Sequence, residues 1–171
     1  PDRDGRHGQG AGSRRPTSPG GFRSGVAADP FAAQQAMRAL DTNVLARFFV
    51  DDPDDAQAAK QRPIAIAALA ERSFVSATVL LELEWVMRGF YELPTRDISR
   101  VLRALASIEH VTFEDRDAVL VAVDAFDKGL DFADALHLAR SSRASGFATF
   151  DQRFAKRAKA LSLTPPVELL G

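Results

Sequence analysis

Residues 37–50 read MRALDTNVLARFFV, a short apolar run that ends at an acidic residue and passes directly into a helical stretch. The run Met37–Leu40 predicts a buried strand that ends at Asp41. The stretch Thr42–Val50 predicts a short helix, which the DDP sequence at 51–53 would end. Downstream, the chain keeps alternating between short apolar runs and longer helical periods.

The later apolar runs predict four more strands, the last of them an edge strand: Phe74–Ala77, Val111–Phe113, Phe147–Phe150 and Val167–Leu170. The helical periods cover Asp54–Ala70, Val79–Phe90, Thr95–Ser107, Ala118–Lys128, Asp131–Ser145 and Gln152–Ala160. Strands separated by helices of about 10–15 residues indicate βαβ crossovers and parallel pairing. We therefore expect an α/β fold in three layers, with a four- to five-stranded, mostly parallel sheet flanked by helices.

Local signals place the ends of several of these helices. Pro63 should kink or divide the second helix, because proline lacks the N–H that a helix interior uses. Thr78 can cap the third helix, and either Asp115 or Asp117 can cap the fifth. Gly146 is expected to end the sixth.

The composition is that of a globular domain. The chain has 171 residues, of which 46% are hydrophobic and 26% charged, enough for one domain with a sizeable core. It has no cysteine, so any metal must be held by oxygen or imidazole ligands. The apolar runs are short and interrupted by charges, so we expect no transmembrane helix, no secretory signal and a cytoplasmic location.

Residues 1–36 differ in kind from the rest of the chain. They contain 7 of the 11 glycines and 4 of the 9 prolines, with almost no apolar periodicity. Such a segment cannot bury enough surface to offset its chain entropy, so we predict a disordered extension. Because the sequence begins with Pro and Met37 directly precedes the first strand, one hypothesis is that the native domain is 37–171.

The charge distribution is not the one typical of a nucleic-acid-binding protein. Residues 1–36 carry five Arg and three Asp, and the rest carries 17 basic and 20 acidic residues, which gives net charges of +2 and −3. Nucleic-acid-binding domains usually show a basic excess. If this chain acts on RNA, it needs a local basic patch, a metal bridge or a second subunit.

Four acidic residues are predicted to lie at one edge of the sheet. Asp41 and Asp151 follow predicted strands, and the carboxyl ends of parallel strands meet at the edge where ligands bind. Glu82 and Asp134 lie near the starts of helices that rise from that edge. Each of them alone is also explained as a helix cap or a surface charge, but their joint placement favours a functional site.

Carboxylates gathered in one crevice repel one another unless they are protonated or neutralised by cations. In a chain without cysteine the natural neutraliser is Mg²⁺ or Mn²⁺, which prefers carboxylate and water oxygens. Ions held in this way are suited to the hydrolysis of phosphodiesters.

At these residues the chain resembles the PIN-domain nucleases, and among them the VapC-type toxins of bacterial toxin–antitoxin modules. The segments that carry the resemblance are LDTNVL at 40–45, FVS at 74–76 with LLEL at 80–83, DFADALHLA at 131–139 and ATFD at 148–151. The order and spacing agree from Met37 to about Leu170.

The resemblance implies Mg²⁺- or Mn²⁺-dependent cleavage of RNA by a catalytic set of Asp41, Glu82, Asp134 and Asp151. It implies that Asp41 and Asp134 are the principal metal ligands, with Glu82, Asp151 and Asp131 contributing. It also implies a homodimer and a cognate antitoxin that binds over the active site.

Neighbouring residues are candidates for supporting roles. Thr42, Asn43 and Thr149 can donate hydrogen bonds that orient the carboxylates. His137, three residues after Asp134, could reach the site, although a histidine in an apolar helix is more often packed. The basic residues that could contact phosphates are Arg47, Arg88, Arg140, Arg143, Arg153, Lys156 and Arg157.

Two other functions compete with the nuclease. A metal-dependent phosphohydrolase acting on small esters would suit strand-end aspartates, but such enzymes commonly have an Asp-x-Asp pattern, and here Asp41 is followed by Thr42 and Asn43. A catalytically silent protein-binding module would have acids that serve only as caps, and the complete acidic set argues against it.

Overall fold

The structure is a computed structural model that describes residues 37–171. The extension predicted at residues 1–36 lies outside the described residues. The strands are β1 (Arg38–Ala39), β2 (Ser73–Val75), β3 (Val111–Phe113), β4 (Phe147–Thr149) and β5 (Val167–Leu169). The helices are α1 (Thr42–Phe49), α2 (Ala56–Leu69), α3 (Ala77–Gly89), α4 (Thr95–Ser107), α5 (Arg116–Asp127), α6 (Phe132–Arg140) and α7 (Gln152–Ala160).

All strand pairs among the described residues are parallel, which confirms the predicted α/β class. The strands form two sheets, however, where the sequence predicted one. β1, β2 and β3 are neighbours in that order, with Ala39 opposite Phe74 and Phe74 opposite Thr112. β4 pairs only with β5, with Ala148 opposite Glu168.

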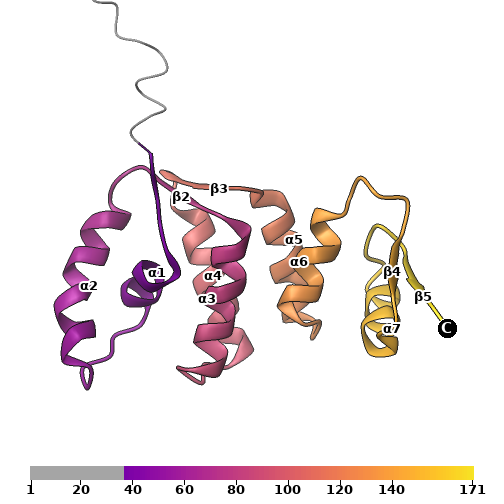
Figure 1. The fold of residues 1–171 in the computed structure, drawn as a ribbon, viewed down its shortest axis with the longest axis horizontal. Helices are drawn as coiled ribbons and strands as arrows, with labels where there is room; N and C mark the ends of the chain where they lie inside the picture. Colours follow the sequence, from indigo (N-terminus) through magenta and orange to yellow (C-terminus); the bar gives the residue numbers. More distant parts are fainter. Residues whose placement is uncertain (1–36) are drawn as a thin grey trace, which may run out of the picture.

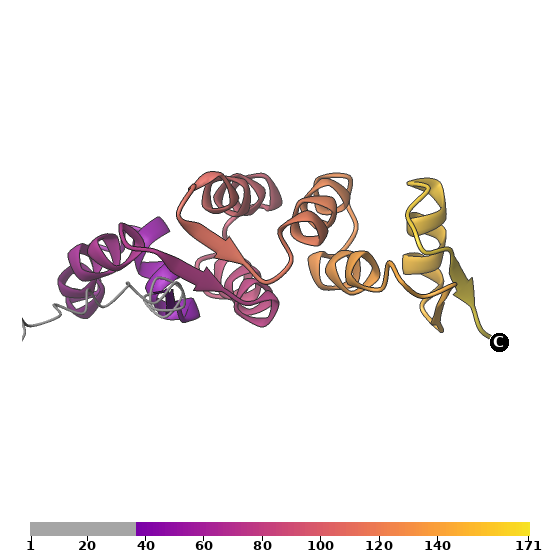
Figure 2. The same cartoon turned by 90° about the horizontal axis from the view of Figure 1, so that it is seen from above.

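The elements follow one another along the long axis of the molecule. α1 and α2 lie at one end, α3 and α4 come next, then α5 and α6, and β4, α7 and β5 lie at the other end (Figure 1). The view from above gives the same order (Figure 2). The two sheets therefore lie well apart in the molecule.

An ion pair joins the end of α6 to the residue that follows β3. Arg140, the last residue of α6, donates a 2.6 Å bond to Glu114. Glu114 directly follows β3 and accepts a 2.9 Å bond from the backbone N–H of Ala77 at the start of α3. These two bonds connect the end of α6 to the end of β3 and to the start of α3.

The apolar faces of the central helices supply most of the core. Leu80, Leu83 and Met87 of α3 are fully buried, as the helical spacing of these residues requires. They belong to one cluster with Leu102 of α4 and Phe132 of α6. No helix within residues 37–171 is long and apolar enough to cross a membrane.

Two local predictions about helix ends and breaks are corrected. Pro63 lies inside α2 without dividing it, so of the two predicted outcomes, a kink or a division, the division is wrong. Asp55 caps the start of this helix through the N–H groups of Gln57 and Ala58. Ser76, not Thr78, caps α3 by accepting a bond from Val79 N–H.

The sixth helix is also shorter than predicted. α6 ends at Arg140 rather than near Ser145. At its end the Ser141 hydroxyl donates a 2.8 Å bond to the carbonyl of His137. Serine side chains compete in this way for the backbone groups that a continuing helix would use.

Candidate active site

Asp41 and Glu82 are brought together through Thr42. Asp41 occupies the N-cap position of α1, yet its side chain makes no capping hydrogen bond. Thr42 is buried and donates a 2.7 Å bond to Oε2 of Glu82, across 40 residues of sequence. Asn43 donates a longer bond, 3.4 Å, to Oδ2 of Asp41. Thr42 and Asn43 thus each donate a hydrogen bond to an acid of the predicted set.

The two glutamates of α3 are distinguished by their surroundings. Glu84 is buried, and Arg88 donates to it bonds of 2.7 and 3.3 Å. Glu84 is therefore engaged in an internal ion pair, which also raises the pKa of Arg88 through a hydrogen bond and charge attraction. Glu82 is exposed, and the bond from Thr42 orients its carboxylate.

Asp131, Asp134 and Asp151 form a second group. They line a cavity of about 420 Å³ together with Gly129, Leu130, Arg153, Phe154 and Arg157. Asp131 caps α6 through Oδ1, which accepts from the N–H groups of Ala133 and Asp134 at 2.9 and 3.3 Å.

Asp151 makes the equivalent cap on α7. Its Oδ1 accepts from the N–H groups of Arg153 and Phe154 at 2.7 and 2.9 Å. The Asp151 N–H in turn donates a 3.0 Å bond to the Thr149 hydroxyl. Thr149 therefore positions the backbone of Asp151 rather than its carboxylate.

The pKa of Asp134 is raised, as expected for an acid among other acids. Burial raises its pKa, and the charges of Asp131 and Asp151 raise it further, while His137 lowers it. His137 is exposed next to this group and not packed in the core. A cation placed between these carboxylates would relieve the repulsion that the raised pKa expresses.

The two acidic groups do not meet in this chain. Arg140 at the end of α6 is joined through Glu114 to the start of α3, whereas Asp131 at the start of α6 acts on Arg88 in the last turn of α3. The helices α3 and α6 are therefore antiparallel. Asp131 and its neighbours lie toward the far end of α3, and neither Asp41 nor Glu82 contributes to the raised pKa of Asp134.

The donors are of the right kind for Mg²⁺ or Mn²⁺, because every candidate ligand is a carboxylate. The positions of these carboxylates, however, do not suit a metal ion. Within residues 37–171 no three His, Asp or Glu side chains are close enough together to hold a metal ion. The single chain thus presents two partial sets of ligands.

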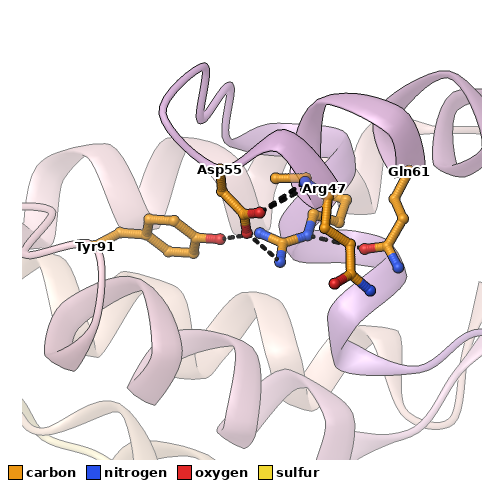
Figure 3. A network of polar contacts seen from close by, with 6 residues as sticks. Arg47, Asp55, Gln61 and Tyr91 are labelled. Atoms are coloured by element: carbon orange, nitrogen blue, oxygen red, sulfur yellow. Dashed lines mark hydrogen bonds and ion pairs between the residues drawn. The ribbon is translucent and has the colours of Figure 1, made fainter.

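Several of the predicted phosphate-contacting residues have internal partners. Arg47 donates to the Tyr91 hydroxyl at 2.8 Å, to Asp55 at 3.1 Å and to Gln61 at 3.3 Å, and so joins α1 to α2 and to the end of α3 (Figure 3). Arg88 and Arg140 are paired with Glu84 and Glu114.

The basic side chains of α7 are placed differently. Arg153, Lys156 and Arg157 are exposed, and Arg153 and Arg157 line the cavity of the second acidic group. Arg157 also donates to the carbonyl of Lys128. Among the predicted phosphate-contacting residues, those on α7 are therefore the best candidates for the basic patch that RNA binding would need.

Glu114 is a structurally important acid that the sequence did not single out. The bonds from Ala77 N–H and Arg140 lower its pKa. It directly follows β3, so the rule that selected Asp41 and Asp151 at strand ends applies to it equally. That position after a strand is the signal that could have found it, although Glu114 lies outside the segments that carry the family resemblance.

Comparison with known proteins identifies the family. The family model described as PIN domain matches residues 38–160, which is more than half of the chain. No curated protein and no solved structure matches significantly. The chain belongs to the PIN-domain family, whose members are typically Mg²⁺-dependent nucleases.

Proposed function

We propose that this chain is a Mg²⁺- or Mn²⁺-dependent endoribonuclease and the VapC-type toxin of a toxin–antitoxin pair. The observation that carries the proposal is the crowded group of Asp131, Asp134 and Asp151, which lines one cavity with Arg153 and Arg157. Carboxylates that attract cations, next to guanidinium groups that attract phosphates, suit a phosphodiester substrate.

The proposed catalytic set is Asp41, Glu82, Asp134 and Asp151, with Asp41 and Asp134 as principal metal ligands and Asp131 contributing. When bound, a divalent cation activates water and neutralises charge on the phosphate. The geometry of Asp41 supports a ligand role, since its carboxylate is not used as a helix cap. Thr42 would hold Glu82 in place through its 2.7 Å bond.

The α7 helix is the proposed contact for the RNA backbone. Arg153, Lys156, Arg157 and Lys159 are exposed on it, and the first and third of these line the acidic cavity. Phosphate contacts of this kind release counterions, so RNA binding should weaken steeply as salt rises.

The toxin proposal includes two protein partners and a location. A homodimer and a small antitoxin that covers the active site are expected for a VapC-type protein, and cellular RNA places the activity in the cytoplasm. The exposed apolar side chains of Trp85 on α3 and of Phe90, which directly follows this helix, offer surface for such contacts.

The test is an assay of the purified full chain on total RNA, single-stranded DNA and p-nitrophenyl phosphate, each with Mg²⁺, Mn²⁺ or EDTA. We expect metal-dependent cleavage of RNA within the chain. Hydrolysis of p-nitrophenyl phosphate alone would indicate a small-ester phosphohydrolase instead. No turnover of any substrate would contradict the proposal.

A further inference from the structure

We propose that the ring of Phe150 stacks on an unpaired base of the RNA, in a nucleotide next to the phosphate that is cut. The substrate is therefore a single-stranded segment, because a base inside a duplex is stacked on both of its faces. Aromatic side chains bind unstacked bases of single-stranded RNA in this way. This inference rests on the proposed nuclease function and names the class of RNA that the site accepts.

Phe150 is the most exposed large apolar side chain within residues 37–171. Its exposed fraction is 77%, and among these residues it belongs neither to the hydrophobic core nor to the side chains packed against the core. A phenylalanine that stays in water forgoes the free energy that its burial would provide. Packing within the described part of the chain therefore does not account for an aromatic residue at this position.

The ring of Phe150 lies on the face of the small sheet that is opposite α7. Phe147 contacts Phe154 of α7, with ring centroids 5.6 Å apart. Successive side chains of a strand point to opposite faces, so Ala148 and Phe150 face away from α7. Ala148 and its partner across the sheet, Glu168, are both exposed on that face. A flat ligand can therefore approach the ring from this side.

Hydrogen bonds fix the backbone on both sides of Phe150. The carbonyl of Thr149 accepts a 2.8 Å bond from Leu170 N–H. The Thr149 hydroxyl accepts a 3.0 Å bond from Asp151 N–H, and this bond spans Phe150. Asp151 in turn caps the start of α7. A ring on a fixed backbone has less freedom to lose when a ligand binds, which favours stacking.

Phe150 is also adjacent to the acidic cavity. Asp151, the next residue in the chain, lines this cavity together with Asp134 and Arg153. Consecutive Cα atoms are about 3.8 Å apart, so the ring begins one residue away from a proposed catalytic acid. A phosphate drawn to the cavity by a cation and by the guanidinium groups brings its own base toward the ring.

A base fits this surface better than a protein partner does, because the apolar area is small. Across the small sheet from Thr149 and Phe150 lie Leu169 and Leu170, which are 48% and 43% exposed. A phenylalanine side chain contributes about 150–250 Å², whereas a stable protein interface buries about 800 Å² on each partner. One ring beside the basic side chains of α7 matches one base and its phosphate.

The first test is the kinetics of cleavage of one RNA strand, alone and in a duplex, in Mg²⁺. The wild type should cleave the single strand faster. Phe150→Ala should raise KM for the single strand about 5- to 150-fold and leave kcat nearly unchanged, since stacking contributes that factor. Phe150→Trp should keep the low KM, whereas Phe150→Leu, which is apolar without a flat ring, should not. Ile64→Ala, at a side chain 69% exposed on α2, is the matched control and should keep the wild-type KM.

A second measurement detects stacking without catalysis. Trp85 is the only tryptophan of the chain, so the Trp85→Phe/Phe150→Trp variant has a single indole, at position 150. A stacked base quenches indole fluorescence. In Ca²⁺, which binds carboxylates, single-stranded oligoadenylate should quench the signal, and an abasic ribose-phosphate strand of equal length should not. The unmodified chain, whose indole lies on α3, is the control and should keep its fluorescence.

The two measurements separate this inference from the proposed function. If the wild type cleaves RNA but Phe150→Ala keeps its KM and the indole is not quenched, stacking is wrong and the nuclease proposal stands. A wild-type KM in Phe150→Leu, or a changed mass of Phe150→Ala in light scattering, would also overturn the inference, because it would assign the side chain to apolar packing or to a protein interface. If the wild type does not cleave, the nuclease proposal fails and the titration still decides whether Phe150 binds a base.

Discussion

The Thr42 hydroxyl donates a 2.7 Å hydrogen bond to Oε2 of Glu82, which joins the first turn of α1 to the middle of α3. Thr42 is 3% exposed, so little water can replace this bond. The bond links two segments of the family motif that are 40 residues apart and fixes an otherwise exposed carboxylate.

Replacing Thr42 by Val should therefore impair catalysis more than folding. Valine keeps the shape but cannot donate, which costs about 1 kcal/mol of stability. Loss of an orienting hydrogen bond to a metal-site acid typically lowers activity about 10–100-fold. RNA cleavage and urea denaturation measure the two effects, and Thr42→Ser should retain both properties. Unchanged cleavage by the valine variant would remove Glu82 from the site.

Asp41 and Asp151 should differ in what they contribute to stability. Asp151 caps α7 through two backbone N–H groups, so Asp151→Ala should cost about 1 kcal/mol. Asp41 makes no such bond, so Asp41→Ala should change stability by less than about 0.5 kcal/mol. Urea denaturation at pH 7 compares them, with Asp151→Asn as a control that can still cap. Equal losses at both positions would contradict this account of Asp41.

Arg88 should matter for stability because it neutralises a buried carboxylate. The Glu84 side chain is 4% exposed and its ion pair with Arg88 is 2.7 Å long. Arg88→Ala leaves Glu84 buried without its partner and should cost about 2 kcal/mol, somewhat less than a fully buried pair because Arg88 is half exposed. The double variant Arg88→Ala/Glu84→Leu should recover part of the loss in thermal unfolding. A double variant as unstable as Arg88→Ala would show that the pair is not responsible.

Glu114 should make stability depend on pH in the acid range. Bonds from Ala77 N–H and Arg140 lower its pKa in the folded chain. A lowered pKa contributes stability above the unfolded value, about 4.3 for a glutamate, and this is lost as pH falls through the folded value. Glu114→Gln should flatten the curve of stability against pH below about pH 5, whereas the exposed control Glu109→Gln should not. The same slope in both variants would exclude Glu114.

Local structure could be predicted from the sequence to a large extent. β3, α4 and α7 have the predicted bounds, because proline, aspartate caps and short apolar runs mark these ends directly. Two of the helix ends that were predicted wrongly are places where two signals competed. Ser76 and Thr78 could both cap α3, and the serines after Arg140 end α6 before Gly146 does.

The pairing of strands was predicted less well, since it depends on contacts between distant residues. The local sequence pattern does not predict the ion pair between Arg140 and Glu114, which are 26 residues apart. For the same reason the sequence placed all four acids at one edge, whereas Thr42 and Glu82 define one group and Asp134 and Asp151 another. Whether these acids act together stays a prediction.

The most direct measurement of the central claim is the rate of RNA cleavage by the full chain and by Asp41→Asn, in Mg²⁺ or Mn²⁺ and in EDTA, at matched thermal stability. Cleavage that requires the metal and falls at least about 100-fold in Asp41→Asn is the predicted result. Cleavage that persists in EDTA, or that is unchanged in Asp41→Asn, would contradict a carboxylate-held metal site at Asp41.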